Sequence, residues 1–473
     1  MSIRSLGLLA VSLSVLLAPE SRAGESLSLS KGIQVTVKEV SGQLRVAEPV
    51  TFSFPLRKKD KIKSPSQLVL VGPDDQVVPS QMRVLERWKG SVNDPNREIR
   101  WVLVDAQVDV SIDGEATYRV RRRDGLDPEE PTGPTLVVTS DESGVFVDTG
   151  TAHFRISAMT ANFLDLLRAD LDGDGLVEEG EELIDQPTDA GFVLTDRFGA
   201  EYSSAASPVT VSIEEAGALR TVVRVDGLHE PVPAGSGIDR DFFQYRTRYT
   251  FYAGKPYVRV QHTLRNAYLD DPLGSIGFEG YALHTGLDED ARMGGPPFFA
   301  RYGLDDDVPF PLSGASRLYQ DSEGGVNWNL SEGTSFRGFT VRNATDTEVE
   351  SGDQATGYVY VKSGTSAVTL FMRDWFENFP KGFAFDGDTG VRFDIFPAEF
   401  GTWHYLDDAQ QKTTDFFVIG HGPNGPLVGD VIKKLDLPLH PHPDPAWTLK
   451  TKAWGDHGDL DPNITPEDWP GMI

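Results

Sequence analysis

Oxygen-bearing residues fall at the spacing of a calcium-binding loop over residues 170–181. Acidic side chains occupy the first, third, fifth, ninth and twelfth positions of this stretch, and Gly175 occupies the sixth. A hard cation requires hard oxygen ligands, a glycine for the sharp turn, a backbone carbonyl from the seventh residue and a bidentate carboxylate at the twelfth, as in an EF-hand loop. The predicted Ca²⁺ ligands are Asp170, Asp172, Asp174, the carbonyl of Leu176, Glu178 and Glu181.

The alternative for this loop is a plain surface turn, since aspartate and glycine both favour turns. Five carboxylates so close together would repel one another without a cation, which favours the calcium interpretation. The sequence contains no second copy of the loop, so a paired calcium sensor is not expected.

Arginines form a second pattern, because alternation places two of them on the more polar face of each of three predicted strands. If these strands are neighbours, their guanidinium groups could recognise the carboxylates of an acidic sugar. The alternative is a set of cross-strand ion pairs with acidic residues, of which the chain has 72. The pairs are Arg220 with Arg224, Arg246 with Arg248, and Arg259 with Arg265, and the substrate-binding candidates are Arg246, Arg248 and Arg259.

Trp403 and His404 are two further substrate-binding candidates. Trp403 could stack on a pyranose ring, with His404 beside it. The alternative is the end of a strand with ordinary aromatic packing. No catalytic residue is predicted, because metalloprotease, nucleophile-elbow, P-loop and CxxC motifs are all missing from the sequence.

The elements that must position these residues are strands, since period two dominates the chain. Between residues 102 and 110, valine or alanine at every second position alternates with mostly polar residues, which indicates a strand with one buried face. Together with frequent Gly, Pro, Asn and Asp between such segments, this predicts an all-β protein of sandwiches or barrels. The other strands are expected at Ile33–Val37, Leu68–Val71, Thr117–Val120, Thr135–Thr139, Thr210–Glu214, Leu219–Asp226 and Tyr358–Val361, with a hairpin of Phe243–Tyr252 and Tyr257–Asn266.

The first 23 residues have the pattern of a secretory signal. Arg4 precedes an apolar run, and Ser21-Arg22-Ala23 forms a small-x-small cleavage site. The run is too short to span a bilayer, so we expect a secreted protein, extracellular or periplasmic, without membrane insertion. The chain has no cysteine and therefore no disulfides, and its net charge of −28 makes nucleic acid a poor partner.

Changes in amino-acid composition divide the chain after residue 23 into predicted domains. The stretch Asp124–Pro134 is rich in proline and carboxylates, which indicates a linker between a domain at 24–132 and a larger one at 133–434 that contains the calcium loop. After residue 434 prolines recur without any periodic pattern. Residues 435–473 are therefore predicted to be a Pro- and Trp-containing extended tail or the start of a missing domain.

Several segments resemble the exo-rhamnogalacturonan lyase-like, or YetA-like, family. Residues 81–88 and 100–105 are similar to its N-terminal part, and the segments similar to its sandwich are 214–220, 249–256, 373–381 and 411–415. The resemblance implies a small N-terminal RIFT-type β-barrel, then a large antiparallel β-sandwich and a C-terminal α/α toroid. The sequence departs from this pattern because loop 170–181 is an insertion and the toroid is largely missing.

Three functions are consistent with these residues. The first is a secreted calcium-binding β-sandwich protein that binds or supports an acidic, pectin-type polysaccharide. The second is a polysaccharide lyase that acts by β-elimination, which needs a base beside the sugar carboxylate and a cation or arginine to hold it. The third is an extracellular structural subunit that associates with copies of itself. Whether the chain is an enzyme is left open by the sequence.

Overall fold

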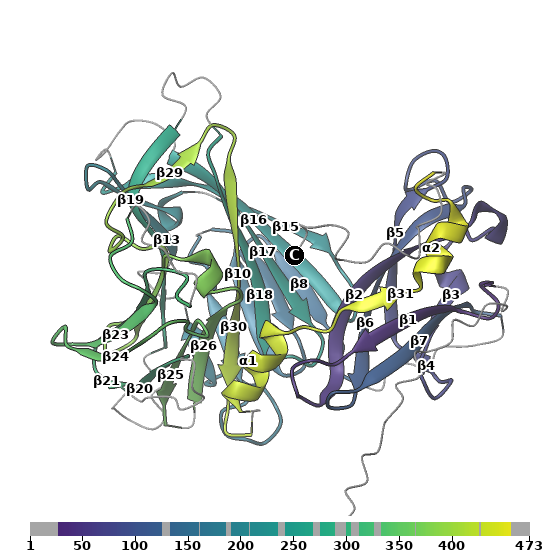
Figure 1. Ribbon diagram of the computed structural model, residues 1–473, viewed down its shortest axis with the longest axis horizontal. Helices are drawn as coiled ribbons and strands as arrows, with labels where there is room; N and C mark the ends of the chain where they lie inside the picture. Colours follow the sequence, from purple (N-terminus) through teal and green to yellow (C-terminus); the bar gives the residue numbers. More distant parts are fainter. Residues whose placement is uncertain are drawn as a thin grey trace, which may run out of the picture.

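A computed structural model describes residues 27–124, 133–159, 161–185, 191–207, 209–234, 242–267, 275–288, 299–303, 312–325, 333–364, 366–424 and 427–455. The predicted signal, most of the predicted linker and the last part of the predicted tail lie outside these residues. Figure 1 shows an N-terminal unit in purple and blue beside a larger sandwich in teal and green. Every pairing between the described strands is antiparallel, and the all-β fold class predicted from the sequence is confirmed.

The N-terminal unit consists of two sheets that share one hydrophobic core. The core includes the alternating residues of β6, of which Val102 and Val104 are fully buried, as the period-two pattern predicts. The five-stranded sheet comprises β31 (Pro441–Pro443), β1 (Ile33–Lys38), β7 (Glu115–Arg122), β3 (Leu68–Val71) and β4 (Val77–Val78), in that order. The three-stranded sheet comprises β2 (Arg45–Pro55), β6 (Ile99–Val110) and β5 (Ser80–Arg87).

The first layer of the sandwich carries the hairpin predicted from the sequence. Along its two long central strands, alternate residues such as Tyr249, Phe251, Val258 and Val260 are buried in the core. In order, this layer contains β15 (Thr210–Glu215), β16 (Arg220–Val232), β17 (Phe242–Tyr252), β18 (Tyr257–Arg265), β30 (Gln411–His421), β26 (Ser366–Met372), β25 (Tyr358–Ser363), β20 (Phe299–Tyr302) and β21 (Leu312–Ser313).

The second layer packs on the same core, and β14 joins it to the first layer by also pairing with β16. In order, it contains β14 (Glu201–Ser203), β13 (Gly191–Asp196), β19 (Ser275–Gly286), β28 (Gly390–Phe396), β27 (Lys381–Phe385), β22 (Ser316–Gln320), β23 (Phe339–Asn343) and β24 (Glu348–Gly352), with β29 (His404–Asp407) beside β19.

A separate five-stranded sheet also contributes to the sandwich core. Its Phe154 packs on Phe251 of the first layer, with ring centroids 5.1 Å apart. Its edge ends in the predicted calcium loop, which connects the last two strands of the sheet. In order, the sheet contains β8 (Val137–Asp141), β9 (Gly144–Asp148), β10 (Ala152–Ser157), β11 (Leu166–Ala169) and β12 (Glu182–Asp185).

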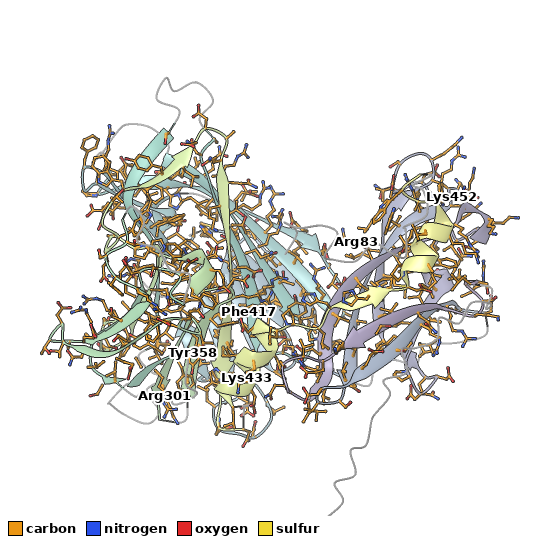
Figure 2. The ribbon with its side chains drawn as sticks, viewed as in Figure 1. Arg83, Arg301, Tyr358, Phe417, Lys433 and Lys452 are labelled. Carbon is orange, nitrogen blue, oxygen red and sulfur yellow. The ribbon has the colours of Figure 1, made fainter. Side chains whose placement is uncertain are left out.

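The C-terminal residues return from the sandwich to the N-terminal unit. Helix α1 (Val428–Asp436) buries Val431, Ile432 and Leu435 against the first layer, next to Phe417 (Figure 2). Strand β31 then pairs with β1, and helix α2 (Pro445–Thr451) packs on the N-terminal core through Trp447. No helix among the described residues is long and apolar enough to cross a membrane.

Candidate functional site

The predicted calcium loop connects two antiparallel strands. β11 precedes it and β12 follows it, with Leu167 opposite Ile184. An EF-hand loop lies between helices, so here the same twelve-residue spacing occurs on a different support. The buried side chain of Leu171 anchors the loop.

The loop's backbone already has the turn that a calcium site requires. Gly175 has φ +90°, a region that only glycine adopts readily, at the position predicted for the sharp turn. The carboxylate of Asp170 accepts hydrogen bonds from the backbone N–H groups of Gly173 (2.6 Å) and Gly175 (3.0 Å). Asn424, which the sequence gave no reason to select, donates from Nδ2 to the carbonyl of Gly173 (2.9 Å).

Three of the predicted ligands converge. One oxygen from each of Asp170, Asp172 and Asp174 lies within 4.8 Å of the others. Glu181 is buried, and its carboxylate accepts hydrogen bonds from the backbone N–H groups of Leu171 and Glu178, both 2.7 Å. The side chains of Leu176 and Glu178 are exposed. The donor set consists of hard oxygens, which fits Ca²⁺ and would not suit a soft metal.

The predicted arginine face exists, because β16, β17 and β18 are neighbours. Arg224 lies opposite Arg248 in the register of β16 and β17, and Arg246 lies opposite Asp226. Two like charges placed directly opposite each other would be destabilising without compensation. Acidic residues from β15, β16 and β30 supply that compensation.

These acids pair with nearly every arginine of the face. Arg248 donates from Nε (2.6 Å) and Nη2 (3.1 Å) to the two carboxylate oxygens of Glu214. These hydrogen bonds hold the pKa of Glu214 below its ordinary value. The other pairs are Arg224 with Glu214 and Asp226, Arg246 with Asp226, Arg259 with Asp415, and Arg220 with Asp105 and Glu215. The ion-pair alternative from the sequence therefore describes most of this face.

Two arginines nevertheless retain unused donors. Arg246 donates through Nε to Asp226 (2.7 Å), and within the described part of the chain its two Nη groups have no protein acceptor. Arg265 is exposed and, within the same residues, has no acidic partner. Arg246 and Arg265 are diagonal neighbours, because Arg246 lies opposite Thr263 and Gln244 lies opposite Arg265. Both line a groove of about 250 Å³ together with Arg248, Gln244, Gln261 and Thr413.

This groove lies on the same side of the sandwich as the contact with the N-terminal unit. Arg83 on β5 faces the sandwich and forms an ion pair with Glu215 of β15, with 2.6 Å between the nitrogen and the oxygen (Figure 2). Gln81 adds a hydrogen bond to the carbonyl of Arg220 (3.2 Å). The N-terminal unit thus covers one end of the arginine face.

Trp403 and His404 lie apart from the arginines. His404 begins β29, which pairs with β19 of the second layer, whereas the arginines belong to the first. His404 is only 7% exposed, stacks on Phe400, and its Nε2 donates to the carbonyl of Pro397 (2.9 Å). This arrangement favours the packing alternative for His404. Trp403 is 47% exposed and retains a free ring surface.

Comparison with known proteins supports the family resemblance and the fold. The fold is similar to that of an alpha-mannosidase from Enterococcus faecalis V583, with a TM-score of 0.52 and 12% identity over 87% of this chain and 46% of the other. A glycosyl hydrolase family 38 protein from Enterococcus faecalis gives a TM-score of 0.52 and 11% identity over 87% of this chain and 47% of the other. The chain thus spans about half the length of these two structures.

No curated protein matches the sequence. Residues 136–280, however, match the family model of the PcRGLX-like protein central beta sandwich domain. The resemblance predicted from the sequence is therefore confirmed, and these residues form a sandwich domain of the rhamnogalacturonan lyase-like, PcRGLX-like type.

Proposed function

We propose that the protein is an exported, calcium-binding β-sandwich protein that binds an acidic, pectin-type polysaccharide. The observation that carries this proposal is the groove between β17 and β18, where Arg246 and Arg265 keep guanidinium donors available in a chain of net charge −28. The match to a rhamnogalacturonan lyase-like sandwich supports the same class of ligand.

The chemistry of the groove fits a uronate. A guanidinium group has five N–H donors, and Arg246 uses only its Nε on Asp226, so its Nη groups can bind a second carboxylate. Gln244 and Gln261 lie on the same face and can both donate to and accept from sugar hydroxyls. Arg248 and Arg259 are engaged with Glu214 and Asp415, and their role is to fix those acids and the strands around the groove.

The test is binding of polygalacturonate, followed by calorimetry, to the wild type and to the double variant Arg246→Gln/Arg265→Gln. Each lost charge-assisted hydrogen bond should weaken binding about tenfold. The control is Arg337→Gln, which removes one positive charge by the same substitution from an exposed pair with Asp353. If the double variant binds polygalacturonate as well as Arg337→Gln does, the groove is not the binding site.

Two parts of this proposal rest on the sequence patterns. Export rests on the signal over residues 1–23, and the mature chain should begin at Gly24 in mass spectra of secreted protein. Calcium binding rests on loop 170–181, in which three aspartates converge around a preformed turn. Bound Ca²⁺ would neutralise these carboxylates and hold β11 and β12 together at the edge of their sheet.

The lyase alternative has a direct readout. β-Elimination from a uronate leaves an unsaturated product that absorbs ultraviolet light, and its release from polygalacturonate or rhamnogalacturonan would favour the lyase over the binding protein. Self-association, the other alternative, would appear as a molecular mass that rises with concentration.

A further inference from the structure

A pocket of about 390 Å³ lies where the sandwich meets the N-terminal unit. The sandwich lines it with the predicted calcium loop, the β17–β18 turn, the end of β30 and helix α1, and Glu48 of β2 lines it from the N-terminal unit. At this junction Arg45 of β2 donates to the carbonyl of Lys434 at the end of α1 (3.1 Å), which holds the two units together (Figure 1). Small-molecule sites occur preferentially at such junctions.

Most of the pocket wall is apolar. Tyr257, Val431 and Leu435 line it with buried side chains, Pro256 lies next to Tyr257 in the chain, and glycines from the surrounding turns leave the space between them open. A wall of this kind, with only a few polar groups, is typical of a site for a small molecule. It favours a ligand that has an apolar part.

Two half-buried lysines supply the positive charge of the wall. Lys255 belongs to the β17–β18 turn and Lys434 to the last turn of α1. Nζ of Lys255 lies 3.4 Å from the carbonyl oxygen of Val46, and among the described residues neither lysine forms an ion pair with a carboxylate. Burial lowers the pKa of Lys255, against the attraction of Glu48, and the charge of Lys434 lowers it further. Two like charges thus lie close together, and an anion beside them would relieve their repulsion.

The acids of the wall are already engaged elsewhere. Glu48 is buried and pairs with Arg45, with 3.4 Å between the nitrogen and the oxygen. Asp170 accepts hydrogen bonds from the backbone N–H groups of Gly173 and Gly175 within the calcium loop. Ca²⁺ bound in that loop would also neutralise the Asp170 carboxylate. The charge of the pocket therefore favours an anionic ligand.

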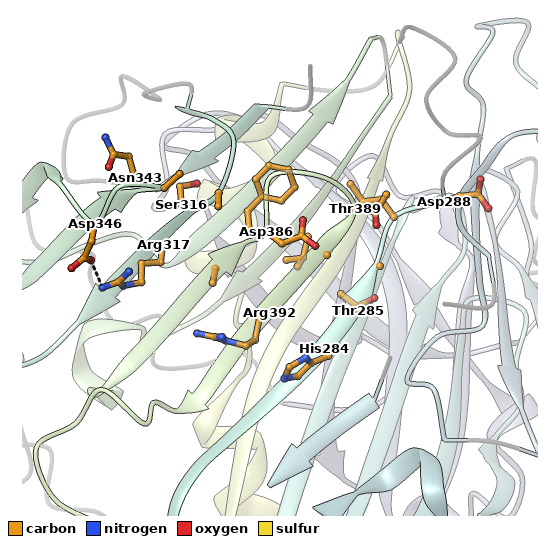
Figure 3. A pocket seen from close by; sticks show the side chains of 18 of the residues that line it. His284, Thr285, Asp288, Ser316, Arg317, Asn343, Asp346, Asp386, Thr389 and Arg392 are labelled. Atoms are coloured by element: carbon orange, nitrogen blue, oxygen red, sulfur yellow. Dashed lines mark hydrogen bonds and ion pairs between the residues drawn. The ribbon is translucent and has the colours of Figure 1, made fainter. Parts of the chain in front are cut away.

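The larger cavity of the sandwich has the opposite arrangement. It has a volume of about 800 Å³ and lies on the second layer. Figure 3 shows Arg317 beside Asp346, with which it forms an ion pair (2.6 Å), and Arg392 pairs with Asp394 (2.8 Å). These arginines are compensated within the protein, whereas the two lysines of the smaller pocket are not.

We propose that the pocket between the two units binds a small organic acid, whose carboxylate pairs with the ammonium groups of Lys255 and Lys434. Such charge-assisted hydrogen bonds are stronger than those between neutral groups. The apolar part of the acid packs against Tyr257, Val431 and Leu435. Ca²⁺ in the loop strengthens the binding, because it neutralises the aspartate in the wall, and this part rests on the calcium site proposed above.

The experiment is calorimetric titration of the full chain with phenylacetate and with phenylacetamide, which has nearly the same shape but no charge. Phenylacetate should bind saturably, and phenylacetamide about tenfold more weakly. Lys255→Met and Lys434→Met, which keep the length of the side chain, should each weaken phenylacetate binding about fivefold. The matched control is Lys433→Met, which removes one charge from the same turn of α1 at an exposed position outside the pocket (Figure 2) and should keep the wild-type affinity.

The same titrations with Ca²⁺ and with chelator test the calcium part. Phenylacetate should bind about fivefold more tightly with Ca²⁺. If Ca²⁺ binds but leaves the affinity for phenylacetate unchanged, the coupling is wrong. If no Ca²⁺ binds, the calcium site of the proposed function is wrong, and the titrations with chelator still decide whether the lysines bind the acid.

Reciprocal controls separate this pocket from the arginine groove. Arg246→Gln/Arg265→Gln should leave phenylacetate binding intact, and Lys434→Met should leave polygalacturonate binding intact. The proposal is overturned if phenylacetate does not bind or if phenylacetamide binds as tightly, and neither of these results depends on a variant. It is also overturned if both Lys255→Met and Lys434→Met bind phenylacetate as tightly as the wild type does.

Discussion

A directed chain of hydrogen bonds crosses the core of the sandwich and should make its stability depend on pH. The carbonyl of Phe243 can only accept, so Nδ1 of His229 carries the proton (2.9 Å) and its Nε2 accepts from the Tyr281 hydroxyl (3.1 Å). The Tyr281 oxygen then accepts from Nε2 of His262 (2.6 Å), whose Nδ1 accepts from the Thr247 hydroxyl (2.8 Å). Every polar atom in this chain is satisfied only while both histidines are neutral.

The magnitude follows from the pKa of His229. Burial lowers it from 6.5 to about 4, against a smaller opposing effect of the hydrogen bond to Phe243. The difference between a pKa of 6.5 and one of about 4 corresponds to about 3 kcal/mol. The folded pKa is depressed, so this stability is fully present above pH 6.5 and is lost as the pH falls towards 4. Burial, together with the nearby His229, also lowers the pKa of His262, which adds to the effect in the same direction.

The assay is urea unfolding between pH 7.5 and 5.5, where few carboxylates titrate. Below pH 6.5, the protonation of His229 alone should lower the unfolding free energy of the wild type by about 1.4 kcal/mol for each unit by which the pH falls. His229→Gln should remove that part of the slope, while His442→Gln, at an exposed position on β31, should not. Tyr281→Phe leaves the Nε2 atoms of His229 and His262 without a hydrogen-bond partner and should lower the unfolding free energy by about 2–6 kcal/mol at pH 7.5. The reasoning fails if His229→Gln retains the full wild-type slope.

Two further predictions concern other parts of the molecule. Calcium at one hundred times its Kd should stabilise the wild type by about 2.7 kcal/mol. Chelator or Asp172→Ala should abolish this gain, whereas Glu179→Gln, at a non-ligand position, should keep it. If chelation leaves the midpoint of thermal unfolding unchanged and no heat of calcium binding is detected, the loop is only an acidic turn. Trp447→Ala should lower the unfolding free energy by about 3–5 kcal/mol, because Trp447 is 1% exposed and its indole N–H donates to the carbonyl of Pro55 (2.7 Å). A loss below about 1 kcal/mol would mean that α2 does not support the N-terminal core.

Local alternation was sufficient to predict many strands of the fold. The predicted strand Leu68–Val71 has the same bounds as β3, and the predicted hairpin differs from β17 and β18 by one residue at two ends. The hairpin strands bury about every second residue, whereas β3 is a short apolar run with all four residues buried, and both patterns are properties of the local sequence. The spacing of the predicted calcium loop could be recognised for the same reason, because its twelve positions are contiguous.

Pairing across the sheets could not be predicted in this way. The partner of Arg259 is Asp415, 156 residues away, because β30 lies between β18 and β26 in the first layer. The sequence therefore left open whether the arginines bind a ligand or acids of the same protein. The cavity of about 800 Å³ on the second layer is a stronger case, because its lining residues range from Asp185 to Arg392 and no contiguous motif marks it.

The C-terminal segment shows why missing periodicity does not imply missing structure. Residues 435–473 were expected to form an extended tail or the start of a missing domain, whereas Leu439 and Trp447 are part of the N-terminal core. The prolines of β31 cannot donate to a ladder, so its three residues at the edge of a sheet leave no alternating pattern to detect. Buried Arg45 then joins the two units, since it pairs with Glu39 and donates to the carbonyls of Lys434 (3.1 Å) and Leu437 (2.6 Å) at the end of α1. A positive charge at a helix C-terminus is favourable, so this contact fixes α1, and the sandwich face beneath it, to the N-terminal unit.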